Sequence, residues 1–223
     1  MSSTSFYLQG KRNLRNLNNY ISYNNPAVSY NARLFPWGIK NSFIPLCRKN
    51  SNLRIVKKKI VFGILAFIVI GFLIPQNLKM PVAGAGNSSY NHETYWYGGW
   101  GSSVVHKGVD IFARKGTSVH SSTWGIVLGT MELSKGGKCV LVLGPKWRLH
   151  YYAHLNEIRT SPFSIVTQNS EIGTVGNTGK AKNTPAHLHY SIATICPYPW
   201  RIDDSAQGWM KMFYLNPIDY LSE

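Results

Sequence analysis

Two short clusters of histidine and aspartate have the composition of a metal site. His106 and Asp110 are four residues apart in HKGVD, and His187 and His189 are two apart in HLH. On a β-strand, residues two or four apart project from the same face, so each cluster can present its side chains together. Imidazole and carboxylate ligands that leave one tetrahedral position open are typical of a catalytic zinc site, whereas structural sites are closed.

A further histidine, His154, lies between these clusters in the tyrosine-rich segment YYAHL. The sequence has no HExxH, GxSxG or Walker motif, so no helix-borne glutamate is available beside a zinc pair. If an activated water attacks a carbonyl here, the expected proton acceptor is a histidine, because its pKa lies near neutrality. Each of these motifs alone is more often structural, and only their combination in a β context predicts a metal site.

The segments that must position these residues are predicted to be β-strands. Short apolar or alternating runs recur between glycine, asparagine and proline, a pattern typical of antiparallel sheets with short hairpins. We expect an ordered loop at 197–217. The predicted strands are 107–113, 117–120, 124–131, 138–143, 147–154, 171–175 and 187–194.

The formal net charge of +15 is concentrated at the N-terminus. Residues 1–59 contain 11 of the 24 Lys and Arg and no acid, which gives +11, and residues 60–223 contain 13 against 9 acids, which gives +4. We interpret residues 1–59 as a basic, disordered cytoplasmic tail, because positive residues flank the cytoplasmic end of inserted segments. Nucleic-acid binding by this tail is the less favoured alternative, and we expect no nucleic acid among the partners.

Residues 60–74 lack polar side chains and follow Lys57, Lys58 and Lys59. A helix over this run is about 22 Å long, shorter than the ~30 Å hydrocarbon core, although snorkelling lysines can extend its reach. We favour a single transmembrane helix at 60–75, at the inner (cytoplasmic) membrane, with residues 76–223 in the periplasm or outside the cell. The alternatives are a buried core helix and a signal peptide cleaved near the A-G-A sequence at 83–85.

The cysteines do not form a metal-binding motif of their own. No CxxC or Cys/His cluster is present to compete for the metal. Cys139 and Cys196 would both lie outside the cytoplasm, where a disulfide is allowed, and two separate thiols are the alternative.

Four segments together resemble one known family. HKGVDIFARKGTSVHSSTWGIV, YYAHL, IGTVGNTG and PAHLHYSI occur in this order, and the combination resembles the catalytic domain of lysostaphin-type (LytM-like) zinc metallopeptidases, which cut peptides in bacterial cell walls. The resemblance covers about residues 81–221. It implies a mainly β fold, an antiparallel β-sheet domain with a groove between loops.

The resemblance also implies roles for individual residues. In the family, the HxxxD pair and the second histidine of HxH bind one zinc ion per domain, which maps onto His106, Asp110 and His189. The first histidine of HxH and the histidine of the YxHL-like segment are the catalytic pair, which maps onto His187 and His154. We expect His187 to act as general base and His154 to stabilise the oxyanion.

One departure from the family lies close to the first ligand. Some members have a tyrosine six residues before it, where this chain has Trp100. A phenol is therefore not available there to stabilise the transition state, although an indole N–H could substitute for it. Trp100 and Tyr152 are the candidate substrate-binding residues. The aromatic residues of 95–100 either hold the substrate or belong to the core.

The sequence therefore predicts a zinc metalloendopeptidase that hydrolyses peptide cross-links of bacterial peptidoglycan. The alternative is a non-catalytic module of the same fold that binds the cell wall or activates another wall hydrolase. Such modules usually lack some of the ligands, whereas all five key residues are intact here.

Overall fold

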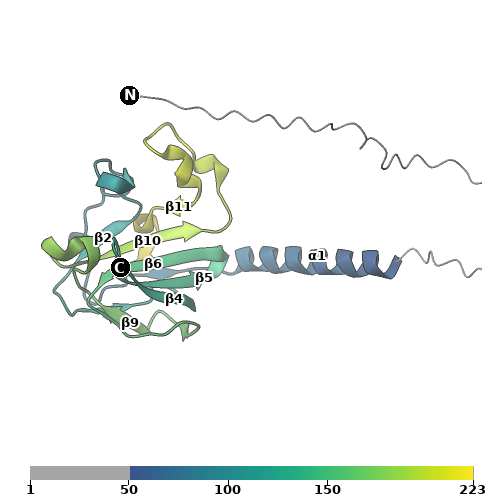
Figure 1. The fold of residues 1–223 in the computed structure, drawn as a ribbon, viewed down its shortest axis with the longest axis horizontal. Coiled ribbons are helices and arrows are strands. Elements are labelled where there is room, and N and C mark those ends of the chain that lie inside the picture. Colours follow the sequence, from purple (N-terminus) through teal and green to yellow (C-terminus); the bar gives the residue numbers. More distant parts are fainter. Residues whose placement is uncertain (1–50, 223) are drawn as a thin grey trace, which may run out of the picture. The chain divides into compact units, whose positions relative to one another are not determined.

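Helix α1 (Ser51–Leu73) precedes a domain of short strands in the computed structural model, which describes residues 51–222 (Figure 1). These residues belong to one compact unit. The predicted tail over residues 1–59 lies largely outside the described residues, so its interpretation stays a prediction.

The domain contains three sheets. The largest has seven strands in the order β11-β10-β6-β5-β4-β8, with β2 also pairing with β10, and all its pairs are antiparallel. A second sheet has the antiparallel order β3-β9-β7, and β1 pairs in parallel with β12. The predicted, mainly antiparallel β fold is therefore confirmed. The strands are β1 (Leu78–Lys79), β2 (Val109–Phe112), β3 (Ser118–His120), β4 (Gly125–Leu133), β5 (Gly137–Gly144), β6 (Arg148–Leu155), β7 (Glu157–Ile158), β8 (Ile165–Val166), β9 (Glu171–Thr174), β10 (His187–Thr194), β11 (Tyr214–Leu215) and β12 (Leu221–Ser222).

All of the predicted strands form, with ends within two residues of those expected. The remaining strands have two residues each, too few to show an alternating pattern. Short 3-10 helices lie in several of the connections between strands, and the predicted loop at 197–217 contains two of them followed by β11. These helices are η1 (Asn87–Ser89), η2 (Gly101–Ser103), η3 (Pro145–Trp147), η4 (Gly179–Asn183), η5 (Pro199–Arg201), η6 (Gly208–Met212) and η7 (Pro217–Asp219). Cys139 and Cys196 are separate thiols and form no disulfide.

The core lies against one face of the seven-stranded sheet. In β10, Leu188, Tyr190 and Ile192 are fully buried, and they pack with Val140, Val142 and Tyr152 of the neighbouring strands. Side chains alternate between the two faces of a strand, so His187, His189 and Ser191 project to the opposite face. One face of β10 therefore supports the core, and the other carries the candidate site.

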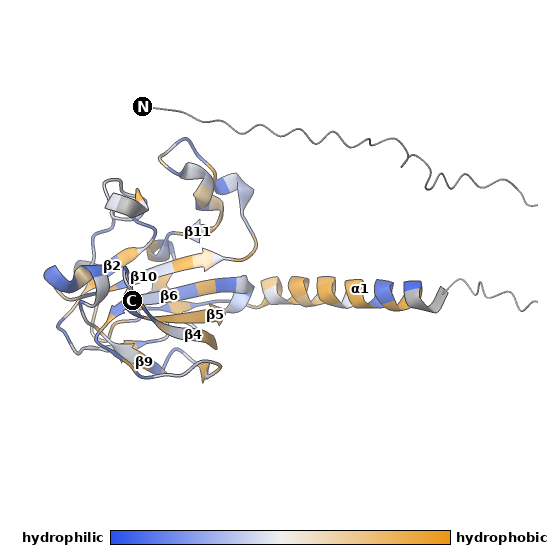
Figure 2. Ribbon diagram, in the orientation of Figure 1, coloured by the Kyte–Doolittle hydropathy of each residue, from blue (hydrophilic) through white to orange (hydrophobic). Residues whose placement is uncertain are grey.

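Helix α1 carries the apolar run, and Figure 2 shows it as hydrophobic over most of its length, with hydrophilic residues near its start. Within residues 51–222, the structure contains no helix that combines the length and apolar composition needed to cross a bilayer. The transmembrane helix predicted at 60–75 is therefore not supported. The three lysines at 57–59 lie inside the helix rather than ahead of it, so only part of its 23 residues is apolar.

Candidate metal centre and active site

Three potential metal ligands converge where β2 runs beside β10. His106 precedes β2, Asp110 lies in β2, and the antiparallel register places His189 of β10 directly opposite Asp110. The Nε2 atom of His106 lies 3.1 Å from Oδ1 of Asp110 and 3.0 Å from Nδ1 of His189. Nδ1 of His189 lies 2.8 Å from the same carboxylate oxygen. The structure thus brings together the three residues predicted to bind the metal.

The hydrogen bonding of His106 shows that this cluster suits a cation. Its Nδ1 atom lies 3.1 Å from the carbonyl oxygen of Thr94, and a carbonyl can only accept, so Nδ1 carries the proton. In the neutral ring, Nε2 therefore holds a lone pair that faces Asp110 and His189. Two imidazole nitrogens and a carboxylate are a donor set that zinc prefers, and the Thr94 carbonyl is the outer partner that orients the ring.

Asp110 is held in its charged form. Burial raises the pKa of this carboxyl group, but its contacts with His106 and His189 lower it by more, so the pKa lies well below its usual range. The group is therefore a carboxylate at neutral pH and available as a ligand.

A short antiparallel pairing of residues 96–98 with residues 105–106, before β2, positions His106. The backbone N–H of Trp96 donates to the carbonyl of His106 at 2.7 Å, and the N–H of His106 donates to the carbonyl of Tyr97 at 3.0 Å. This pairing continues at Gly98, which bridges to Val105. Because the segment runs antiparallel to residues 105–106, it brings the Thr94 carbonyl next to the His106 ring.

The two predicted catalytic histidines face each other beside this cluster. Nδ1 of His187 lies 2.8 Å from the carbonyl of Pro185, and Nδ1 of His154 lies 2.9 Å from the carbonyl of Thr178. Both Nδ1 atoms therefore donate, and both neutral rings present Nε2 as a proton acceptor. The ring centroids are 5.1 Å apart, and Nε2 of His187 lies 3.9 Å from Oδ2 of Asp110.

His154 reaches the site because its backbone leaves the regular strand geometry. Its φ of 63° lies in the left-handed region, which residues other than glycine seldom adopt. With regular alternation it would share the face of Tyr152 and His150, both of which are fully buried. The N–H of His154 donates to the carbonyl of Gly136 at 2.8 Å, and its ring donates to Thr178, so contacts with two other segments hold this conformation.

Glycines let these segments approach the His154 backbone. A Cβ on Gly176 would lie 2.6 Å from the carbonyl oxygen of His154, and one on Gly179 would lie 2.3 Å from the backbone nitrogen of Gly137. Both distances are shorter than real Cβ contacts allow. Thr178 had no role assigned from the sequence, although its place between these glycines was a usable signal.

A pocket of about 330 Å³ lies beside His189, on the face of the sheet opposite the core. Its floor is formed by small and aliphatic side chains of β5, β6 and β10, and polar groups line its remaining walls. The floor residues are Leu141, Leu149, Ser191 and Ala193, and the polar groups come from Lys107, Tyr151 and Tyr214.

The two candidate substrate-binding residues have different positions. Trp100 stacks on His106, with ring centroids 4.3 Å apart and an interplanar angle of 24°, and the residue is 41% exposed. Tyr152 is fully buried, and its hydroxyl accepts from the N–H of Ser122 at 2.8 Å, which removes it from the candidates. The neighbouring Tyr151 lines the pocket instead, because one step along a strand changes the face.

The aromatic run before the site divides between core and surface. Trp96 is buried, and its indole N–H donates to the carbonyl of Ala206 at 3.0 Å, whereas Tyr97 is exposed. Only part of this run is therefore accessible to a ligand.

Residues 104–198 match the sequence profile of the family described as Peptidase family M23. Over this range the chain is similar to peptidase family M23. The matched range includes the three metal-binding candidates and the facing histidine pair, and the resemblance to LytM-like peptidases is confirmed.

Two relatives align with parts of the chain. An L-Ala–D-Glu endopeptidase of Bacillus subtilis is 33% identical over 116 residues, which are 47% of this chain and 35% of the relative. The peptidoglycan DD-endopeptidase ShyA of Vibrio cholerae is 32% identical over 87 residues, which are 39% of this chain and 20% of the relative. The aligned parts thus span about a third and a fifth of these longer proteins.

A solved structure supports the fold assignment. The crystal structure of a protein called LytM from Ruminococcus gnavus has a TM-score of 0.50 and 23% identity, and it covers 64% of this chain and 58% of its own. At this identity the likeness concerns the fold of the domain.

Proposed function

We propose that this chain is a zinc metalloendopeptidase that hydrolyses peptide cross-links of bacterial peptidoglycan. The observation that carries the proposal is the convergence of His106, Asp110 and His189 beside a second pair of histidines whose Nε2 atoms accept protons. The M23 domain supports a peptide substrate, and the two aligned relatives are endopeptidases, one of them of peptidoglycan.

The three converging side chains would hold one zinc ion and leave a coordination position open. Zinc bound there supplies a Lewis acid that polarises the substrate carbonyl and lowers the pKa of a coordinated water to about 7. The carbonyl of Thr94 keeps the His106 ring oriented, and Trp100 covers one face of that ring.

The facing histidines would handle the protons. Burial lowers the pKa of His154 to about 4, while the hydrogen bond to Thr178 acts in the opposite direction. His154 is therefore neutral at neutral pH, and its Nε2, like that of His187, is placed to accept a proton. Either ring can take the proton of the attacking water, and the ring that has taken it can then donate it to the oxyanion or to the leaving amine.

We also propose that the domain acts outside the cytoplasmic membrane, where its peptidoglycan substrate is found. A reporter enzyme fused after Glu223 and active only in that compartment would support this location. Reporter activity in the cytoplasm would contradict it and would exclude the wall as substrate.

A digest of cell-wall sacculi tests the proposed activity. The full chain is loaded with one equivalent of zinc and incubated with purified sacculi, the glycan is then cut with a muramidase, and the resulting muropeptides are identified by mass spectrometry. We expect peptides with newly formed amino termini, in amounts that fall to background for the His106→Ala variant. If the wild type keeps its zinc and binds sacculi but cleaves no bond, the chain is a non-catalytic wall-binding module instead.

A further inference from the structure

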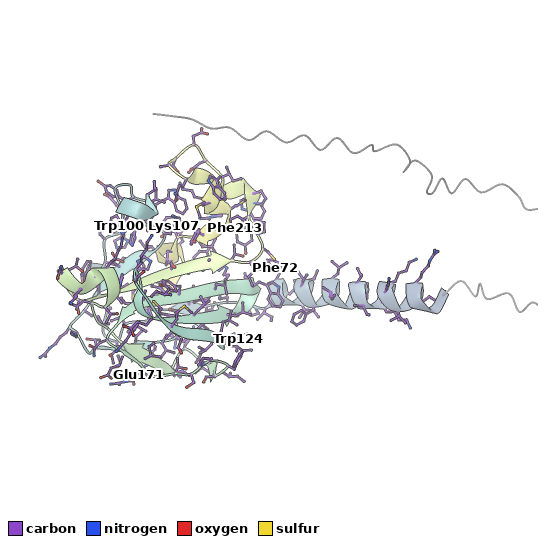
Figure 3. The ribbon with its side chains drawn as sticks, viewed as in Figure 1. Phe72, Trp100, Lys107, Trp124, Glu171 and Phe213 are labelled. Carbon is purple, nitrogen blue, oxygen red and sulfur yellow. The ribbon has the colours of Figure 1, made fainter. Side chains whose placement is uncertain are left out.

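Lys107 follows the first metal ligand and lines the pocket beside His189. Figure 3 shows it on the side of the domain that carries Trp100, away from Glu171. Its ammonium donates to the carbonyl of Ser103 at 3.0 Å and to Oε1 of Gln207 at 2.7 Å. Both acceptors are neutral. They fix the position of this half-buried ammonium group but do not neutralise its positive charge.

Two acidic groups of this region, Asp110 and Asp203, are already paired. Asp110 contacts the two histidine ligands, and Asp203, on the loop that carries Gln207, forms an ion pair with Lys211. Among residues 51–222, no carboxylate is recorded within ion-pair distance of Lys107. Lys211 and Lys107 lie on the same tryptophan, at 5.5 Å and 5.9 Å from the ring centroid of Trp96, so a second cation is close by.

The pocket has the shape and polarity for a short anionic side chain. Ser191 and Ala193 are small, which leaves a volume of about 330 Å³ above the sheet, and Leu141 and Leu149 offer an aliphatic surface for methylene groups. An ammonium group has three donors, and two of those of Lys107 are used by Ser103 and Gln207. One donor is left for a ligand, and a half-buried cation is stabilised most by an anion.

We propose that this pocket binds a free carboxylate of the substrate peptide close to the cleaved bond, with Lys107 as its counter-ion. The ligand class is a residue with a short aliphatic stem and a terminal carboxylate. This inference rests on the proposed function, because His189 borders the same pocket and would place the carboxylate next to the reacting carbonyl.

The test compares one set of peptides in two chemical forms. Cross-linked stem peptides are freed from the glycan by an amidase and acetylated at their amino groups, and half of the sample has its carboxylates converted to carboxamides. The two forms differ in charge and scarcely in size. The values of kcat/KM for both are measured with the zinc-loaded full chain, and the preference is the ratio between them.

We expect the wild type to prefer the carboxylate form by about 10–100-fold, the range of a charge-assisted hydrogen bond. Lys107→Met should bring this ratio close to one, mainly through KM, and Lys107→Arg should retain most of it. High salt should reduce the preference of the wild type. Lys115→Met is the matched control, since Lys115 is an exposed lysine of a turn after β2, and it should behave as the wild type.

The outcomes separate this inference from the proposed function. Equal hydrolysis of both forms by the wild type, or an unchanged preference in Lys107→Met, would overturn the inference and leave the peptidase assignment intact. Hydrolysis of neither form by zinc-loaded wild type would overturn both. Thermal unfolding checks that each variant is folded. If Lys107→Met does not fold, Lys107→Gln takes its place. The preference of the wild type and its response to salt test the inference without any variant.

Discussion

The two histidines of β10 provide a sharp test of the site, because they share one face of one strand but have different partners. Nδ1 of His189 lies 2.8 Å from Asp110 and 3.0 Å from His106. His187 instead donates through Nδ1 to a backbone carbonyl, and its Nε2 stays 3.9 Å from Asp110. We expect His189→Ala to lose zinc and activity, and His187→Ala to lose activity while retaining zinc.

The size of each effect follows from the number of ligands. Structural zinc sites with four ligands bind with about 10–16 kcal/mol at pH 7, or roughly 2.5–4 kcal/mol per ligand. Loss of one of the three converging ligands should therefore weaken zinc binding by about 10²–10³-fold. His187→Ala removes no ligand, so its zinc affinity should stay within about tenfold, the lower limit for loss of an outer partner. A general acid or base typically contributes about 10²–10⁴ to the rate, and activity should fall by that factor.

Zinc per chain is measured by mass spectrometry after dialysis, zinc affinity by competition with a chelator, and activity by the loss of cross-linked muropeptides from sacculi. His92→Ala is the control, since His92 is exposed and is not one of the converging residues. If His187→Ala lost its zinc while His189→Ala kept it, the ligand and the proton-transfer residue would have to be exchanged. Full activity of His187→Ala would remove it from the mechanism.

Three further predictions concern the metal, the glycine contact and the buried histidine. Chelation of zinc should abolish sacculus hydrolysis, and added zinc should restore it, as followed by turbidity. Gly176→Ala should cost about 1–3 kcal/mol in urea unfolding, because its Cβ would meet the His154 backbone. Burial, and secondarily the charge of Arg148, lowers the pKa of His150 to about 3; since the unfolded pKa is about 6.5, stability should fall by about 2–3 kcal/mol between pH 7 and 4.5. His150→Gln should flatten that pH dependence, and an equal slope in both proteins would contradict the assignment.

The main strands and the grouping of the candidate ligands could be predicted because they depend on local patterns, whereas the choice of His189 over His187 as a ligand came from the family resemblance. Alternation along 187–194 is enough to place His187 and His189 on one face, and the strand itself forms as expected. The approach of His106 to Asp110 likewise depends only on one short segment, which consists of β2 and the turn before it. An error of one residue in such reasoning, however, assigns a side chain to the wrong face of the strand. Tyr151 and Tyr152 show this, because the first lines the pocket and the second is buried.

The position of His154 could not be derived from alternation. Its parity with His150 and Tyr152 would place it in the core, and only the family resemblance indicated a catalytic role. The left-handed backbone that turns it to the other face depends on Gly136 and Thr178, which belong to two other segments. Such contacts have no periodic signal in the sequence.

Two other features depended on properties that a local pattern does not contain. The surroundings of Lys107 include Gln207, a residue of a distant loop whose path is not periodic. In the N-terminal segment, the apolar run correctly indicated a helix, but the lysines at 57–59 became part of that helix, which limits its apolar length. The residue at which α1 begins decides how many polar residues the helix includes. The apolar run in the sequence does not determine that residue.

Backbone carbonyls set the tautomers of the site. Three of its four histidines donate through Nδ1 to a main-chain oxygen and turn Nε2 toward the cluster, and the pairs are His106 with Thr94, His154 with Thr178 and His187 with Pro185. His189 differs, since it turns Nδ1 toward the cluster. A carbonyl cannot become a donor, so these tautomers depend on the path of the main chain and not on the identity of the side chains at the accepting positions. The glycines around Thr178 therefore bear on the proposed chemistry, because they control how closely a carbonyl approaches the imidazole of His154, which we propose accepts a proton.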